Sequence, residues 1–108
     1  MSEDTRTFLR TCFDVAVRAA DPEAAVRRSL REDPLDLGRV HRVVVVGAGK
    51  ATAPMAAAAE AILGDRISAG AIVVKYGHGL PLGRIAVHEA GHPVPDEGGL
   101  RGTAALLD

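Results

Sequence analysis

The sequence has a single cysteine, and no apolar run approaches the about 20 residues that a membrane-spanning helix needs. One cysteine, Cys12, excludes an internal disulfide, and the composition fits a reducing compartment. It lies among Phe8, Leu9 and Phe13, so we expect a buried thiol rather than a nucleophile. The first residues, MSEDTRTF, are acidic and polar, unlike a signal peptide. We therefore expect a cytoplasmic protein with no membrane partner.

An excess of basic residues is also lacking. Thirteen lysines and arginines face 14 acidic residues, which gives a formal net charge of −1 and no reason to expect a nucleic-acid partner. A chain of 108 residues is long enough for one domain with one core. Only Lys50 and Lys75 are lysines, and we expect both at strand ends. The alternative is that they are two ordinary solvated side chains.

The N-terminal third predicts two helices. Apolar residues recur at three- and four-residue spacing over 4–20, which is typical of an amphipathic helix. The segment Asp21–Glu23 then combines an aspartate suited to an N-cap, a proline suited to the first helical position and a glutamate suited to the positive end of the dipole. It predicts a second helix over about 22–32. Residues 1–38 are thus expected to be a helical lead-in without chemistry of its own.

The strongest signal is the stretch 42–54, RVVVVGAGKATAP. Four consecutive β-branched residues, Val43–Val46, predict a strand buried on both faces of a parallel sheet. Gly47 and Gly49 allow a sharp turn and leave the backbone uncovered by side chains. Unpaired N–H groups at the start of the following helix, beside Lys50, would form an anion site.

The remaining pattern predicts an α/β fold. We expect an alanine-rich helix at about 51–63, strands at 71–75 and 85–89, and a helix from about Glu97 with Asp96 as its cap. Residues 39–108 would then form a β-α-β-β core. The predicted class is a Rossmann-like parallel sheet with flanking helices, incomplete, and preceded by two N-terminal helices.

Two nucleotide-binding motifs nearly match the glycine loop. A P-loop has four residues between its first glycine and the Gly-Lys pair, but only Ala48 stands there. The dinucleotide fingerprint needs glycine or alanine where Thr52 stands, and an acidic residue where Lys75 ends the second strand. Because a lysine could meet the extra phosphate of NADP, an oxidoreductase remains an alternative.

The segment His88–His92 spells the HExxH pattern of zinc proteases. That mechanism requires a helix, so that both histidines share one face. Gly91 weakens a helix, and Pro93 disfavours helical geometry at the residue before it. The preceding residues alternate like a strand, so we expect no metal site here.

Three segments in this order, VVGAGKATAPMAAAAE, VVKYGHGLP and EAGHPVPDEGG, resemble the N-terminal part of type II glycerate kinase. This is the glycerate 2-kinase family, also labelled MOFRL or hydroxypyruvate reductase-like, and the resemblance runs from about Phe8 to the last residue. It implies ATP-dependent phosphorylation of D-glycerate to 2-phosphoglycerate, with Mg²⁺, in a cleft between two α/β domains. Members are several times longer, so we expect an N-terminal segment that is inactive alone.

The resemblance also implies the site. It makes Lys50 the catalytic residue, and it gives as candidates for binding substrate or phosphate Gly47, Ala48, Gly49, Ala51, Lys75, His78, His92 and Asp96. Independently, ligands of open parallel sheets gather at the carboxyl ends of the strands. The segments around Lys50, Lys75 and His92 should therefore converge, and a cation there suits phosphoryl transfer, which depends on positioning and charge neutralisation.

Two further alternatives stay open. One is an NAD(P)-dependent hydroxypyruvate reductase, and the other is a non-catalytic domain that binds a small anion or assembles with a partner. An incomplete sheet exposes an edge and apolar surface, so we also expect self-association.

Overall fold

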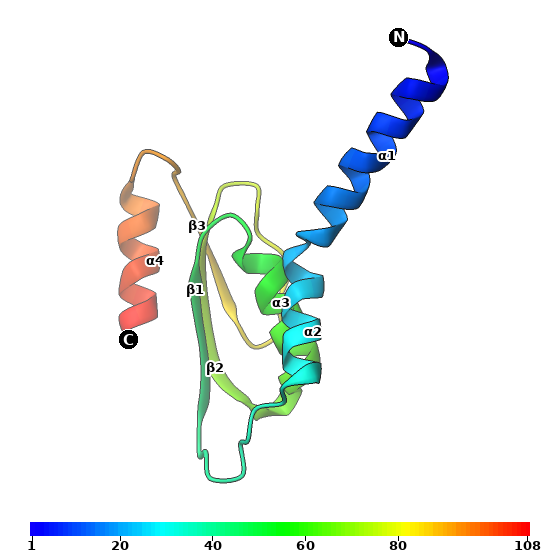
Figure 1. Ribbon diagram of the computed structural model, residues 1–108. Coiled ribbons are helices and arrows are strands. Elements are labelled where there is room, and N and C mark those ends of the chain that lie inside the picture. Colours follow the sequence, from blue (N-terminus) through cyan, green and yellow to red (C-terminus); the bar gives the residue numbers. More distant parts are fainter.

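The computed structural model describes residues 1–108 and shows a parallel sheet with helices on both faces (Figure 1). The elements are α1 (Glu3–Ala19), α2 (Pro22–Glu32), β1 (Val43–Ala48), α3 (Thr52–Leu63), the short 3₁₀ helix η1 (Gly64–Arg66), β2 (Ile67–Lys75), β3 (Ala86–Ala90) and α4 (Glu97–Leu107). The strand order is β1-β2-β3, and both pairs are parallel. The predicted α/β class is confirmed.

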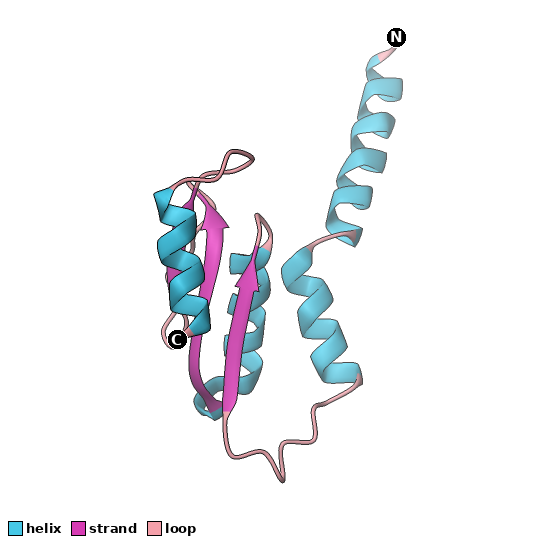
Figure 2. Cartoon of the chain, turned by 90° about the vertical axis from the view of Figure 1, so that its left-hand side faces the viewer, coloured by secondary structure: helices cyan, strands magenta, loops and turns pink.

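Helices α3 and α2 form the layer on one face of the sheet, and α4 lies on the other (Figure 2). The core is built from small residues of α3 against branched residues of the strands. Its buried members are Ala53, Ala56, Ile67, Ile72, Val74 and Ile85. Because alanine has no side chain beyond Cβ, α3 can lie close to the sheet. The predicted alanine-rich helix is present, and its small side chains allow this packing.

Strand β1 is buried on one face only, so the prediction of two buried faces was wrong. Val43 and Val45 pack against the core, whereas Val44 and Val46 are 49% and 59% exposed. Successive side chains of a strand point to opposite faces. Strand β1 is one of the two edge strands, and α4 packs on β2 and β3 instead. The outward-facing valines consequently have no helix above them.

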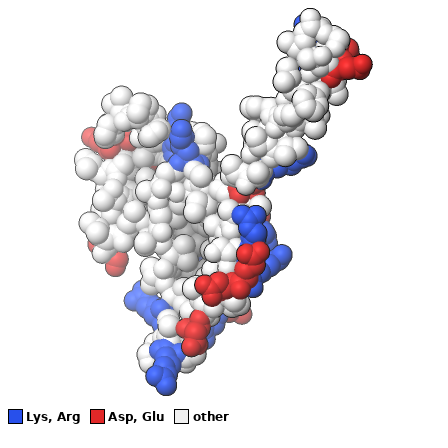
Figure 3. Space-filling view, in the orientation of Figure 1, with Lys and Arg blue, Asp and Glu red and all other residues white.

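Helix α1 projects away from the sheet, and none of its residues is buried (Figure 1). Phe8 and Phe13 are 66% and 67% exposed, and the Cys12 thiol is exposed as well. The expectation of a buried thiol was therefore wrong, because the apolar stripe of α1 meets no other element. Much of the visible surface of α1 is uncharged (Figure 3). No helix of the chain is both long enough and apolar enough to cross a membrane.

Helix boundaries follow the predicted caps closely. Asp21 accepts a hydrogen bond from Ala24 N at 2.8 Å at the start of α2, and Gly64 ends α3 with φ 49°. Strand β2, by contrast, begins four residues before its predicted start at Ala71. Its added segment pairs with β1 at Gly70, where a Cβ would lie 2.8 Å from the carbonyl oxygen of Val45. The absence of a side chain at Gly70 thus allows β2 to lie close to the backbone of β1.

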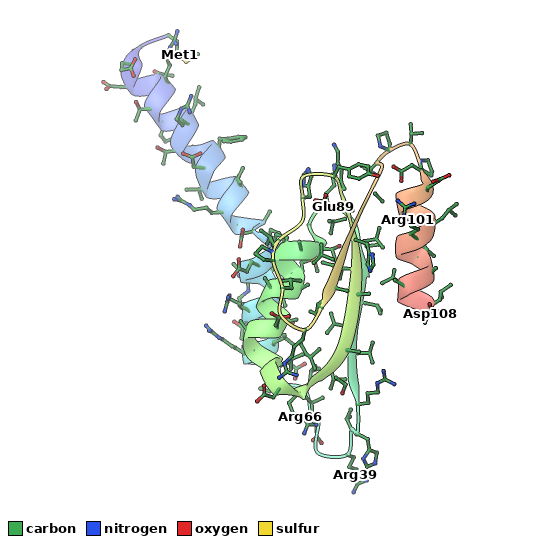
Figure 4. All side chains as sticks on the ribbon, turned by 180° about the vertical axis from the view of Figure 1, so that it is seen from behind. Met1, Arg39, Arg66, Glu89, Arg101 and Asp108 are labelled. Atoms are coloured by element: carbon green, nitrogen blue, oxygen red, sulfur yellow. The ribbon has the colours of Figure 1, made fainter.

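The connection from β2 to β3 contains no helix. It runs back along the sheet to the end where β3 begins. There the Glu60 carboxylate of α3 accepts hydrogen bonds from Gly83 N at 2.7 Å and from Arg84 N at 2.9 Å. At this same end, Arg66 donates to the carbonyl oxygen of Leu37 at 2.9 Å. Figure 4 shows Arg66 opposite the end of the sheet that carries Glu89. These contacts leave the Glu89 end free to form a site.

Candidate functional site

The carboxyl ends of the three strands meet around one pocket of about 120 Å³. Three residues at the end of each strand line it: Ala48, Gly49 and Lys50 at the end of β1, Val73, Val74 and Lys75 in β2, and Ala90, Gly91 and His92 at the end of β3. The sheet therefore brings Lys50, Lys75 and His92, which are far apart in sequence, to the border of one pocket. This convergence was predicted from the parallel arrangement of the strands.

The loop between β1 and α3 is a tight turn that only small residues permit. Gly49 has φ 121°, a left-handed conformation that side chains disfavour. A Cβ at Gly47 would lie 2.6 Å from the Cγ2 atom of Thr52. Gly49 N donates to Val73 O at 3.0 Å, which joins the loop to β2. The turn thus delivers Lys50 to the pocket directly after the strand.

Two backbone donors beside the pocket have no partner within the chain. Gly49 N and Thr52 N are engaged in the turn, but no hydrogen bond engages the N–H groups of Lys50 and Ala51. Helix α3 also lacks a side-chain N-cap, and its Pro54 has no N–H to offer. An uncapped helix N-terminus carries a partial positive charge. The loop therefore retains donors suited to an anion, although fewer than a fully bare loop would have.

The positive charges of the two lysines are not neutralised by carboxylates. All three ion pairs of the chain use arginines: Arg27–Glu23, Arg84–Asp65 and Arg101–Glu97. Lys50 and Lys75 thus border the pocket with both ammonium groups free. Such an arrangement attracts small anions because opposite charges interact more strongly near a protein surface than in bulk water.

The other predicted site residues lie outside the pocket lining. They are Gly47, Ala51, His78 and Asp96. His78 follows β2 in the adjoining loop, where its N–H donates to Lys75 O at 2.9 Å. Gly47 and Ala51 belong to the turn that carries Lys50. Their predicted contact with substrate or phosphate remains a prediction.

Asp96 is already engaged by groups of the chain itself. Its Oδ1 accepts from Gly91 N at 3.0 Å and from Gly99 N at 3.1 Å, and its Oδ2 accepts from the Tyr76 hydroxyl at 2.8 Å. The Gly91 N–H, followed by the Tyr76 hydroxyl, lowers the pKa of Asp96 below its ordinary value. The same hydrogen bond raises the pKa of Tyr76.

Sequence reasoning gave no individual role to Tyr76 or Glu89. Glu89 Oε1 accepts from Gly77 N at 3.2 Å, so both side chains tie the loop after β2 to the β3 side of the site. One signal was present, because Tyr76 is the only tyrosine and directly follows Lys75 at the end of a predicted strand. Its partner, twenty residues further on, could not be identified without the loop geometry.

Known proteins resemble this chain over nearly its whole length. A "Putative hydroxypyruvate reductase" of Agrobacterium vitis is 52% identical over 92 residues, which are 85% of this chain and 20% of that protein. The D-glycerate 2-kinase of Thermotoga maritima is 40% identical over 94 residues, which are 86% and 21%. The chain thus spans about a fifth of the length of these relatives.

The fold leads to the same group of proteins. The crystal structure of a Thermotoga maritima glycerate kinase matches with a TM-score of 0.81 and 36% sequence identity, over 96% of this chain and 24% of that one. Residues 8–108 match a family model described as "Domain of unknown function (DUF4147)". The resemblance to the N-terminal part of glycerate 2-kinases is confirmed, and the chain belongs to the DUF4147 family.

Proposed function

We propose that this chain forms one wall of the active site of a glycerate 2-kinase, the enzyme that phosphorylates D-glycerate to 2-phosphoglycerate with ATP. The observation that carries the proposal is the meeting of Lys50, Lys75 and His92 in one pocket. Membership in a family whose relatives include glycerate 2-kinases supports it. The proposal places the protein in the cytoplasm, where its single cysteine would stay reduced.

Lys50 has the central role in this proposal. Its ammonium group would hold the carboxylate of glycerate or the transferring phosphoryl group, with the free N–H groups of Lys50 and Ala51 beside it. Phosphoryl transfer gains mainly from positioning and from donors preorganised toward developing charge. Lys75 and His92 would line the other side of the same anion. Gly47, Ala48 and Gly49 would act by holding the turn rather than through side chains.

The residues present do not make a fitting Mg²⁺ site. The chain contains no group of three or more His, Cys, Asp or Glu side chains that could hold a metal ion. Two carboxylates that adjoin the pocket segments, Glu89 and Asp96, already accept hydrogen bonds from the chain. Magnesium prefers carboxylate and phosphate oxygens together with its own waters. The proposal therefore gives these 108 residues glycerate binding, and leaves contacts with ATP and Mg²⁺ to residues outside them.

Binding of D-glycerate and inorganic phosphate to the 108-residue chain, followed by NMR titration, tests this proposal. We expect the amide signals of residues 48–50 and 90–92 to shift, and Lys50→Ala to abolish binding without loss of stability. Arg39→Ala removes one exposed positive charge at the opposite end of the sheet and is the matched control (Figure 4). Equal binding by Lys50→Ala and the unchanged chain would refute the assigned role.

A turnover assay separates binding from catalysis. With ATP, Mg²⁺ and D-glycerate, we expect no activity from the chain by itself, because the pocket offers no metal site and is open to water. Measurable turnover would show that the 108 residues contain the whole machinery.

A hydroxypyruvate reductase is the second candidate, since two relatives carry that name. Thr52 stands where the dinucleotide fingerprint needs glycine or alanine, so the loop does not fit a dinucleotide pyrophosphate even though Lys75 could meet the extra phosphate of NADP. We therefore expect no saturable binding when NADPH is added. Saturable NADPH binding that depends on Lys75 would favour the reductase. Anion binding without a role in either enzyme is the remaining alternative.

A further inference from the structure

One carboxylate connects three segments beside the pocket. The Tyr76 hydroxyl donates to Asp96 Oδ2 at 2.8 Å, which joins the loop after β2 to the loop after β3. Asp96 Oδ1 accepts from Gly91 N at 3.0 Å, within its own loop, and from Gly99 N at 3.1 Å, in the first turn of α4. Asp96 therefore holds the tyrosine, the loop and the helix start together.

Two glycines make room for this arrangement. A Cβ at Gly98 would lie 2.8 Å from the carbonyl oxygen of Glu89 and 3.0 Å from the Tyr76 hydroxyl. A Cβ at Gly91 would lie 2.6 Å from the carbonyl oxygen of Val94 and 3.0 Å from Asp96 Oδ2. Both side chains are exposed to solvent, Tyr76 to 52%, but the absence of a Cβ at these two glycines lets the backbone lie against the Tyr76–Asp96 contact.

The connected segments carry pocket residues. Tyr76 directly follows Lys75, and His92 lies in the loop that Asp96 closes. The main chain adds a further connection, because Tyr76 N donates to Ala90 O at 3.1 Å. Neither Tyr76 nor Asp96 lines the pocket itself. Any effect of the pair on a bound anion must therefore act through Lys75 and His92.

We propose that Tyr76 and Asp96 form a positioning clamp, which sets the separation of Lys75 and His92 across the anion pocket. The inference rests on the proposed function in taking that pocket to bind an anion. Holding the two binding groups in place before the ligand arrives reduces the entropy lost on binding. Asp96, expected from the resemblance to contact substrate or phosphate, is assigned here to positioning.

The first test reads the hydrogen bond by spectroscopy. Tyr76 is the only tyrosine and the chain has no tryptophan, so the ultraviolet absorbance of tyrosinate reports Tyr76 alone. The bond to Asp96 raises the pKa of Tyr76, and Asp96→Asn should return it toward the ordinary value of 10.0. Asparagine is also a good N-cap, so α4 keeps its start. If Tyr76 of the unchanged chain titrates at 10.0 and its pKa is the same in Asp96→Asn, the proposal is overturned.

The second test measures whether the Tyr76 hydroxyl affects phosphate affinity and the environment of His92. In Tyr76→Phe the ring remains and only the hydroxyl is lost. We expect about a five-fold weaker affinity for inorganic phosphate, with shifted His92 ring signals in the free protein. Glu60→Gln loosens a loop at the opposite end of the sheet and is the control, for which phosphate affinity should not change. Unchanged affinity and unchanged His92 signals in Tyr76→Phe would refute the clamp.

Failure of the clamp can be told apart from failure of the proposed function. If the unchanged chain binds neither phosphate nor D-glycerate, the proposed function fails for these residues. The clamp is then judged by the free protein alone. Shifted His92 signals in both Tyr76→Phe and Asp96→Asn support it, and unshifted signals overturn it.

Discussion

Single residues determine the shape of the anion pocket through the backbone as much as through charge. Gly49 adopts φ 121°, and its N–H reaches Val73 O of the neighbouring strand. Any other residue would keep that hydrogen bond only at the expense of a strained conformation. The position of Lys50, one residue later, thus depends on a residue without a side chain.

We expect Gly49→Ala to destabilise the chain by about 1–3 kcal/mol, because alanine disfavours this conformation. Urea unfolding followed by circular dichroism measures the change. Gly99→Ala is the control, since Gly99 lies in the first turn of α4 without a positive φ and a Cβ there would meet only ordinary contacts. Equal stability of the two variants would show that the turn can adopt another conformation.

The sequence predicts which residues share the site where strand order decides it, and it does not predict contacts that depend on loop paths. Because parallel strands end at one edge of the sheet, the sequence predicted that the segments of Lys50, Lys75 and His92 meet there. Tyr76 and Asp96 could not be paired that way, since their contact depends on the path of two loops. The exposure of Cys12 likewise depends on which element covers α1, which a helical pattern does not specify.

At the scale of elements, the connection between β2 and β3 is unusual. Parallel strands are normally joined by a crossover of a dozen or more residues, commonly a helix. Here the Glu60 carboxylate of α3 accepts the N–H groups of Gly83 and Arg84, while the neighbouring Leu82 and Ile85 pack against the core. The connecting loop is thus fixed to helix α3 by hydrogen bonds and to the core by apolar packing.

This anchor predicts an acid-dependent stability. Backbone donation from Arg84, then from Gly83, lowers the pKa of Glu60 below its ordinary value of 4.5. The folded-state pKa is the lower one, so the contribution is fully present above the unfolded-state value and is lost as pH falls through the folded value. We expect Glu60→Gln to be less stable at pH 7 and to lose less stability on acidification. Urea midpoints between pH 7 and pH 3 measure both, and Glu32→Gln, an exposed change in α2, is the control. Parallel pH profiles for Glu60→Gln and the unchanged chain would contradict this assignment.

Element ends were predictable where a local signal existed. Asp21 and Asp96 each cap the helix that was predicted to follow them. The start of β2 could not be predicted in this way, because Ser68, Ala69 and Gly70 favour a strand only weakly by themselves. Pairing with β1 recruits them, since Ala69 lies opposite Val44 and Gly70 opposite Val45. Such recruitment is a tertiary effect that propensity does not contain.

For the whole molecule, the uncovered surfaces are as informative as the core. The exposed valines of β1 and the apolar stripe of α1 both follow patterns typical of buried faces. The sequence predicted burial because a pattern records only that a face is apolar. Whether anything covers it depends on the other elements present, and in these 108 residues α4 stops short of β1 while α1 projects free.

The exposed stripe of α1 predicts concentration-dependent self-association of the 108-residue chain. Burying one phenylalanine side chain stabilises by on the order of 1.5–3 kcal/mol. Replacing both Phe8 and Phe13 by serine should therefore weaken association on the order of a hundred-fold or more, as measured by sedimentation velocity. The sheet should stay folded, because neither side chain is part of the core. Serine at Thr7 and Thr11, on the polar face, is the control. A chain that stays monomeric at all concentrations, or that associates equally well in both variants, would rule out pairing through this helix.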